Sequence, residues 1–107
     1  MTETKFPHLF QFFSGYFHED WELDDPHPLA VVSRYLREAK PSIIEETLKE
    51  ITTLKAMNLS EIELNQVLMN ELYCSYDPSF EGKTSVEWLE WLQNTIQQKL
   101  KQLVILT

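Results

Sequence analysis

The residues best suited to chemistry gather in one short stretch, residues 18–28, HEDWELDDPHP. Its candidate metal ligands are His18, Glu19, Asp20, Glu22, Asp24 and His27. Imidazole and carboxylate groups bind divalent metals, but the spacing fits neither common pattern. An EF-hand needs a central glycine and a final glutamate, and an HExxH zinc site needs two histidines on one helical face. We therefore predict no metal site, and instead an acidic, solvated loop with Trp21 and Leu23 anchored in the core.

The single cysteine, Cys74, is the other candidate for catalysis. It would need a base such as His8, His18 or His27, and surroundings that favour the thiolate. The charges nearest to it in the sequence are acidic, so we expect a buried thiol that behaves as a small hydrophobic group. There is no glycine-rich loop to hold a phosphate. The sequence therefore predicts a protein that is not an enzyme and uses no cofactor.

The elements that must position these residues are helices. Apolar residues recur at the three- or four-residue spacing of an amphipathic helix along most of the chain. One helix is predicted over residues 6–14, with Pro7 in its first turn and its end near Gly15. A second is predicted over residues 28–39.

Three capping boxes predict where the later helices begin. In a capping box, a serine or threonine and a glutamate three positions later bond each other's backbone N–H groups. The three pairs are Ser42 with Glu45, Ser60 with Glu63, and Thr84 with Glu87. The spacing thus predicts helices that begin after each of these three residues.

The fold class follows from these patterns. Strand-like runs are short and confined to residues 73–76 and 104–105. We predict an all-α, single-domain bundle of five or more helices over residues 1–107, with loops at 18–28 and 73–83. Residues 1–5 and 104–107 are expected to be loose termini.

The net charge of the chain indicates which classes of binding partner to expect. The 107 residues carry a net charge of −8. Residues 1–25 hold six acids and one base, and residues 58–90 hold seven acids and one base. Proteins that bind nucleic acids or anionic membranes are normally basic. We therefore expect neither partner, and instead a basic protein. The lone cysteine, the missing signal peptide and the absence of a long apolar run point to the cytoplasm.

Two segments carry a family resemblance. FPHLFQFFSGYFHEDWELDD, residues 6–25, resembles the opening of bacterial contact-dependent growth inhibition immunity proteins. YCSYDPSFEG, residues 73–82, resembles the closing signature of the same family, together with the tryptophan–leucine pairs at 88–89 and 91–92. The resemblance covers nearly the whole chain.

The resemblance implies a small, cytoplasmic, helical protein that neutralises a toxin. The toxin would be the C-terminal domain of a large surface-displayed effector delivered by neighbouring cells, often a nuclease and in particular a ribonuclease. We expect a monomer that forms a 1:1 complex and covers the active site of the toxin or its substrate path. The alternative is a small acidic helical adaptor or regulatory subunit that binds an unrelated basic protein.

Two acidic surfaces are candidates for the contact. The first has Glu19, Asp20, Glu22, Asp24 and Asp25 as charge complement, with Tyr16, Trp21 and Tyr76 as aromatic anchors. The second consists of Glu61, Glu63, Glu71, Glu81, Glu87 and Glu90. The sequence does not choose between the two surfaces, and we favour the first only slightly.

Overall fold

A computed structural model describes the backbone of residues 5–106 and the side chains of residues 5–102. Its elements are α2 (Pro7–Tyr16), α3 (Trp21–Asp24), α4 (Pro28–Glu38), α5 (Pro41–Ala56), α6 (Glu61–Gln66), a π-helical turn (Val67–Glu71), a 3-10 turn (Pro78–Glu81) and α7 (Ser85–Leu106). No strand occurs over these residues. The all-α prediction is confirmed.

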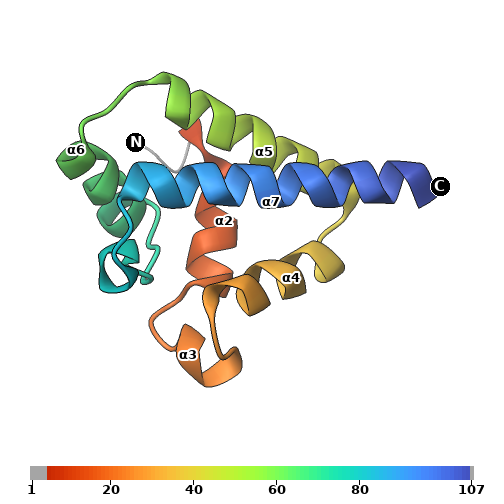
Figure 1. Ribbon diagram of the computed structural model, residues 1–107, viewed down its shortest axis with the longest axis horizontal. Helices are drawn as coiled ribbons and strands as arrows, with labels where there is room; N and C mark the ends of the chain where they lie inside the picture. Colours follow the sequence, from red (N-terminus) through yellow and green to blue (C-terminus); the bar gives the residue numbers. More distant parts are fainter. Residues whose placement is uncertain (1–4, 107) are drawn as a thin grey trace.

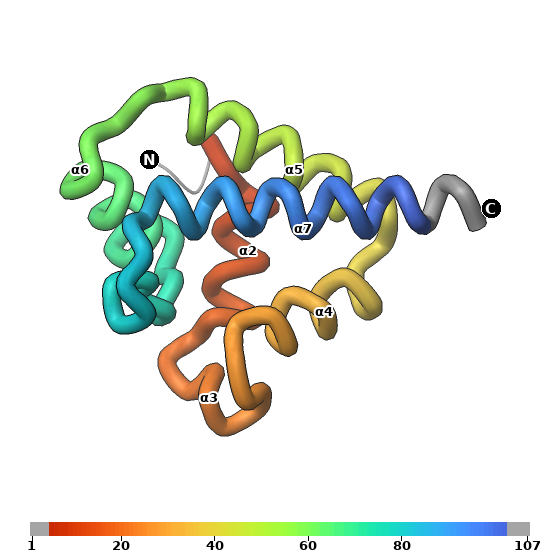
Figure 2. The backbone as a smooth tube through the Cα atoms, viewed as in Figure 1, coloured from red at the N-terminus to blue at the C-terminus, as the bar shows by residue number. Residues whose placement is uncertain are grey.

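The long helix α7 organises the molecule (Figure 1). α5 lies along it, α2 crosses behind it, and α4 lies on the opposite side from α5 (Figures 1 and 2). The radius of gyration is 13.2 Å, which is the value expected of one compact domain of about 100 residues. The helices therefore form a single bundle.

An aromatic cluster fills the centre of the bundle. Phe12, Phe13 and Phe17 are at most 1% exposed, and Trp88 of α7 packs on Phe13 and Phe17. Aromatic side chains therefore make up a large part of the core. Cys74 is also buried, and burial raises the pKa of its thiol to about 12. It is therefore the small hydrophobic group that the sequence predicts.

Helix α2 begins with Pro7 in its first turn, as predicted, but it ends later than predicted. Gly15 lies inside the helix, which continues to Tyr16, and its backbone does not adopt the left-handed conformation of a glycine cap. At the other end, a carboxylate from α5 replaces a local cap. Glu50 accepts hydrogen bonds from the N–H groups of His8 and Leu9, both at 2.9 Å. This contact attaches the start of α2 to α5.

Two of the three predicted capping boxes are confirmed. Ser60 and Glu63 bond each other's backbone N–H groups, and so do Thr84 and Glu87. The third is wrong, because α5 begins at Pro41 and not after Ser42. Proline at the first helical position already has the helical φ angle, so it sets the start of the helix without a side-chain cap.

The remaining predictions differ in accuracy. The helix predicted over residues 28–39 is α4, one residue shorter. Neither strand-like run forms a strand, which agrees with the all-α prediction: residues 73–76 pair with no strand, and residues 104–105 belong to α7. The expectation of loose termini concerns residues 1–5 and 104–107, of which 1–4 and 107 lie outside the described part, and it stays a prediction.

Candidate protein-binding site

The two predicted loops, residues 18–28 and 73–83, lie side by side. The Ser75 N–H donates to the Phe17 carbonyl at 2.8 Å, which joins the two segments through their backbones. Just beyond this bond, Trp21 meets Tyr76 edge to face, with ring centroids 5.8 Å apart. The acids of both segments therefore share one side of the molecule.

Residues 18–28 are more ordered than the predicted loop. They contain α3, a single turn that places Trp21 inward at 8% exposed and Leu23 outward at 84% exposed. The prediction that Leu23 packs in the core is therefore wrong. A helical turn sends residues two positions apart to different sides, so one of the two must face solvent.

His18 holds this turn in place. Its Nδ1 accepts from the Asp20 N–H at 3.1 Å, and its Nε2 lies 3.1 Å from Asp24 Oδ2. The acceptor role of Nδ1 assigns the proton to Nε2, which donates to Asp24. Both ring nitrogens are thus used inside the loop. Across the described residues, no three histidine, cysteine or carboxylate groups converge as metal ligands would.

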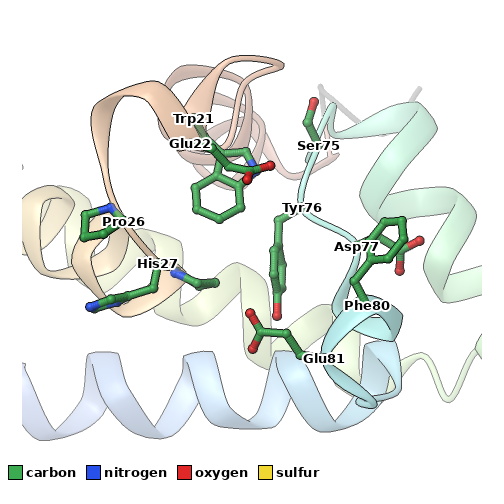
Figure 3. Close-up of a pocket in the computed structure, with 10 residues that line it drawn as sticks. Trp21, Glu22, Pro26, His27, Ser75, Tyr76, Asp77, Phe80 and Glu81 are labelled. Carbon is green, nitrogen blue, oxygen red and sulfur yellow. The ribbon is translucent and has the colours of Figure 1, made fainter.

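A groove of about 450 Å³ lies between the two segments. It is lined by Trp21, Glu22, Pro26, His27, Pro28, Ser75, Tyr76, Asp77, Phe80 and Glu81. Figure 3 shows the Trp21 ring and Glu22 on one side, and Tyr76 with Glu81 on the other. Aromatic faces and carboxylates thus surround the same space.

The predicted acidic residues fall into two groups. Glu19, Asp20, Glu22 and Asp24 are exposed, and apart from Asp24 their carboxylates have no partner among the described side chains. Asp25 is 8% exposed and paired with Arg34. The first group can meet a partner protein, whereas Asp25 is committed to the fold.

Tyr16 belongs with Asp25 in the structural group. Its hydroxyl donates to Glu38 Oε1 at 2.6 Å, and the Arg34 guanidinium lies over its ring, 4.8 Å from the centroid. Burial raises the pKa of Tyr16 to about 12, and the bond to Glu38 adds to the shift. The side chain therefore links α2 to α4.

Tyr76 lies at the bottom of the groove. The residue is 5% exposed, and its hydroxyl has no hydrogen-bond partner among the described residues. The hydroxyl points toward the Glu81 carboxylate (Figure 3). Burial raises the pKa of Tyr76 to about 12, and the negative charge of Glu81 adds to the shift.

The second acidic surface is divided by the structure. Glu63 and Glu87 act in capping boxes, and Glu61 accepts from the Ser85 N–H at 2.8 Å. The hydrogen bonds with Ser60 lower the pKa of Glu63. Glu81, by contrast, lines the groove with the first group. Glu81 of the second acidic surface therefore lies beside the acids of the first.

Two apolar residues of this surface are exposed: Phe80, which the sequence does not single out, and Leu23, which it places wrongly in the core. Phe80 is 88% exposed at the groove, and Leu23 is 84% exposed on α3. Phe80 sits in a short turn that begins at Asp77, whose carboxylate accepts from Ser79 N–H at 2.9 Å, and ends at Gly82 with a φ of 74°. A large aromatic residue inside such a polar turn is the signal that could have identified it.

Comparisons with known proteins agree with one another. A family model described as CdiI immunity protein matches residues 5–96. The chain also superimposes on one chain of the crystal structure of a CdiA-CT/CdiI complex from Y. kristensenii, with a TM-score of 0.84 and 27% sequence identity. That match covers 89% of this chain and 96% of the other. No curated protein matches the chain. No helix in the described part of the chain is long and apolar enough to cross a membrane.

Proposed function

Because the chain belongs to the CdiI immunity protein family, we propose that it binds the C-terminal toxin domain of a cognate contact-dependent growth inhibition effector and neutralises it. The observation that carries the proposal is the match over residues 5–96, together with the likeness to a chain of a CdiA-CT/CdiI complex. The protein acts by binding, not by catalysis. It forms a 1:1 complex with the toxin in the cytoplasm.

The toxin is a nuclease, with a ribonuclease favoured. A nuclease attracts phosphates, so its substrate cleft is basic. A protein with a net charge of −8 can occupy such a cleft in place of the nucleic acid. Opposite charges also raise the association rate, which matters when the toxin arrives active. Neutralisation then follows from covering the active site or the path to it.

The contact surface is centred on the groove and the outer side of α3. Its charged part is formed by the exposed carboxylates Glu19, Asp20, Glu22 and Asp24, and Glu81 extends it. Trp21 and Tyr76 supply its aromatic base. Asp25 and Tyr16 support this surface from behind through Arg34.

Co-purification with the C-terminal domain encoded by the adjacent effector gene tests the proposal. We expect a stable 1:1 complex, loss of nuclease activity in it, and rescue of growth when both proteins are produced together. Affinity should fall as salt is raised, because screening weakens the attraction between charges. Failure to bind that domain, with both proteins folded, would contradict the proposal and favour an adaptor for an unrelated basic protein.

A further inference from the structure

The groove between α3 and residues 73–83 has the chemistry of a receptor for a planar cation. Trp21 and Tyr76 supply aromatic faces, and Glu22 and Glu81 supply carboxylates at its edge (Figure 3). Aromatic faces attract cations through their quadrupole, and carboxylates accept charge-assisted hydrogen bonds. None of the described side chains that line the groove is a lysine or an arginine.

The Tyr76 hydroxyl is a second, independent observation. It is buried, lines the groove and makes no hydrogen bond of standard geometry in the described residues, and the group that it points toward is the Glu81 carboxylate (Figure 3). Leaving a buried polar atom unpaired costs folding free energy, so such atoms commonly mark a place where a ligand completes the bonding. A hydroxyl can accept an N–H bond from a guest while its proton points toward Glu81 (Figure 3).

We propose that the groove receives one arginine side chain of the toxin. This inference rests on the proposed function, which supplies the partner. The guanidinium would lie in the groove against the edge-to-face pair of Trp21 and Tyr76, donate to the Glu22 and Glu81 carboxylates, and donate to the Tyr76 hydroxyl. Lysine fits less well, because its ammonium is a compact point charge that cannot present the fixed, planar set of N–H donors with which a guanidinium bonds two carboxylates at once.

Size and charge agree with this guest. The volume of about 450 Å³ exceeds what a single guanidinium needs and leaves room for the segment that carries it. The molecule already holds cations on aromatic faces elsewhere. The Arg34 guanidinium lies 4.8 Å from the Tyr16 centroid, and Lys83 Nζ lies 5.7 Å from the Trp91 centroid.

Capture of an arginine would explain how binding becomes inhibition. Nucleases hold substrate phosphates with arginine and lysine side chains. An arginine engaged by two carboxylates is no longer available to a phosphate. The immunity protein would thus compete with the nucleic acid for the same side chain of the toxin.

A double-mutant cycle between the two proteins tests the inference. On this chain, E81Q removes a groove charge, and Y76F removes the hydroxyl and keeps the ring. E45Q is the matched control, because Glu45 is exposed on α5, which lies across the molecule from α3 (Figure 1). On the toxin, each arginine is changed to lysine, and each lysine and exposed apolar residue to alanine. Dissociation constants are measured for every pair.

We expect E81Q to weaken binding about 30-fold or more, Y76F to weaken it measurably, and E45Q to change it less than about fivefold. One arginine-to-lysine variant of the toxin should lose a similar factor, and the pair with E81Q should lose little more than either alone. Coupling of E81Q to a lysine or an apolar residue, or full affinity of both groove variants, would overturn the inference. Failure of the unaltered proteins to bind would instead contradict the proposed function.

Discussion

Arg34 donates two hydrogen bonds to the same oxygen of Asp25, through Nε at 3.2 Å and through Nη2 at 2.9 Å. The pair joins α4 to the residue that ends α3, and these hydrogen bonds raise the pKa of Arg34. Asp25 is the only one of the five clustered acids of residues 19–25 whose side chain is buried in the described structure. The cluster therefore combines a structural carboxylate with carboxylates that face solvent.

Replacing Asp25 should damage stability, while replacing its neighbour should not. D25N leaves Arg34 without its charged partner and should lower the free energy of unfolding by about 1.5–3 kcal/mol. D24N removes an exposed carboxylate bonded only to His18 and should cost less than about 1 kcal/mol. Urea denaturation of both variants measures the difference. Equal stability of D25N and the unaltered protein would show that the ion pair contributes nothing.

Charge reversal of the exposed acids should affect binding and leave the fold intact. Changing Asp20, Glu22 and Asp24 together to lysine should slow association with the toxin by about tenfold or more at low salt. The dependence of the association rate on salt should become flatter. Stopped-flow kinetics at several ionic strengths provide the measurement, with circular dichroism as the control for folding. An unchanged rate would place the contact on another surface.

Phe80 should act as an apolar anchor of the interface. It is 88% exposed, so F80A should change the free energy of unfolding by no more than about 0.5 kcal/mol. An aromatic residue buried on binding commonly contributes about 2 kcal/mol or more, which corresponds to a loss of affinity of about 30-fold. I62A is the matched control, because Ile62 is 73% exposed on α6. Equal effects of F80A and I62A in a binding titration would argue against an anchor role.

The sequence predicted the helices better than their ends, and the site least well. Ser60 and Thr84 were found because a capping box is local and both partners lie within three residues. The cap of α2 was missed because its acceptor, Glu50, lies 42 positions from His8. No local pattern can identify such a partner.

Contacts between residues far apart in the sequence also explain why the candidate site is predicted poorly. The sequence predicts residues 18–28 and 73–83 as two separate loops, and only the folded chain shows that Trp21 and Tyr76 are in contact. In the sequence Asp25 stands among acidic neighbours and looks like one of the free acids, whereas its partner Arg34 lies nine positions later, in the next helix. Composition indicates how much charge a segment has, but burial decides which charges remain free.

Alkaline pH should reveal the unpaired hydroxyl of Tyr76. The pKa of this side chain rises from 10.0 to about 12 on folding, so the folded protein keeps its proton where the unfolded chain has lost it. The stability linked to this group is fully present below pH 10 and is lost as the pH rises from 10 to about 12. Tyr16, whose pKa is also raised from 10.0 to about 12, adds to the loss over the same range, and Cys74, whose pKa is raised from 9.0 to about 12, adds to it from pH 9 upward. The unfolding free energy should therefore fall steeply above pH 10.

The variant Y76F separates this contribution from the others. It removes a buried hydroxyl without a partner and keeps the ring against Trp21, so at pH 8 it should be as stable as the unaltered protein or more stable by about 1 kcal/mol. Its stability should also decline less between pH 10 and 12, because one of the groups with a raised pKa is gone. Y73F is the matched control, since Tyr73 is 56% exposed. Urea denaturation across this pH range measures both effects. A Y76F protein that is clearly less stable at pH 8 would mean that the hydroxyl already has a partner in the free protein, and would remove the unsatisfied acceptor from the groove.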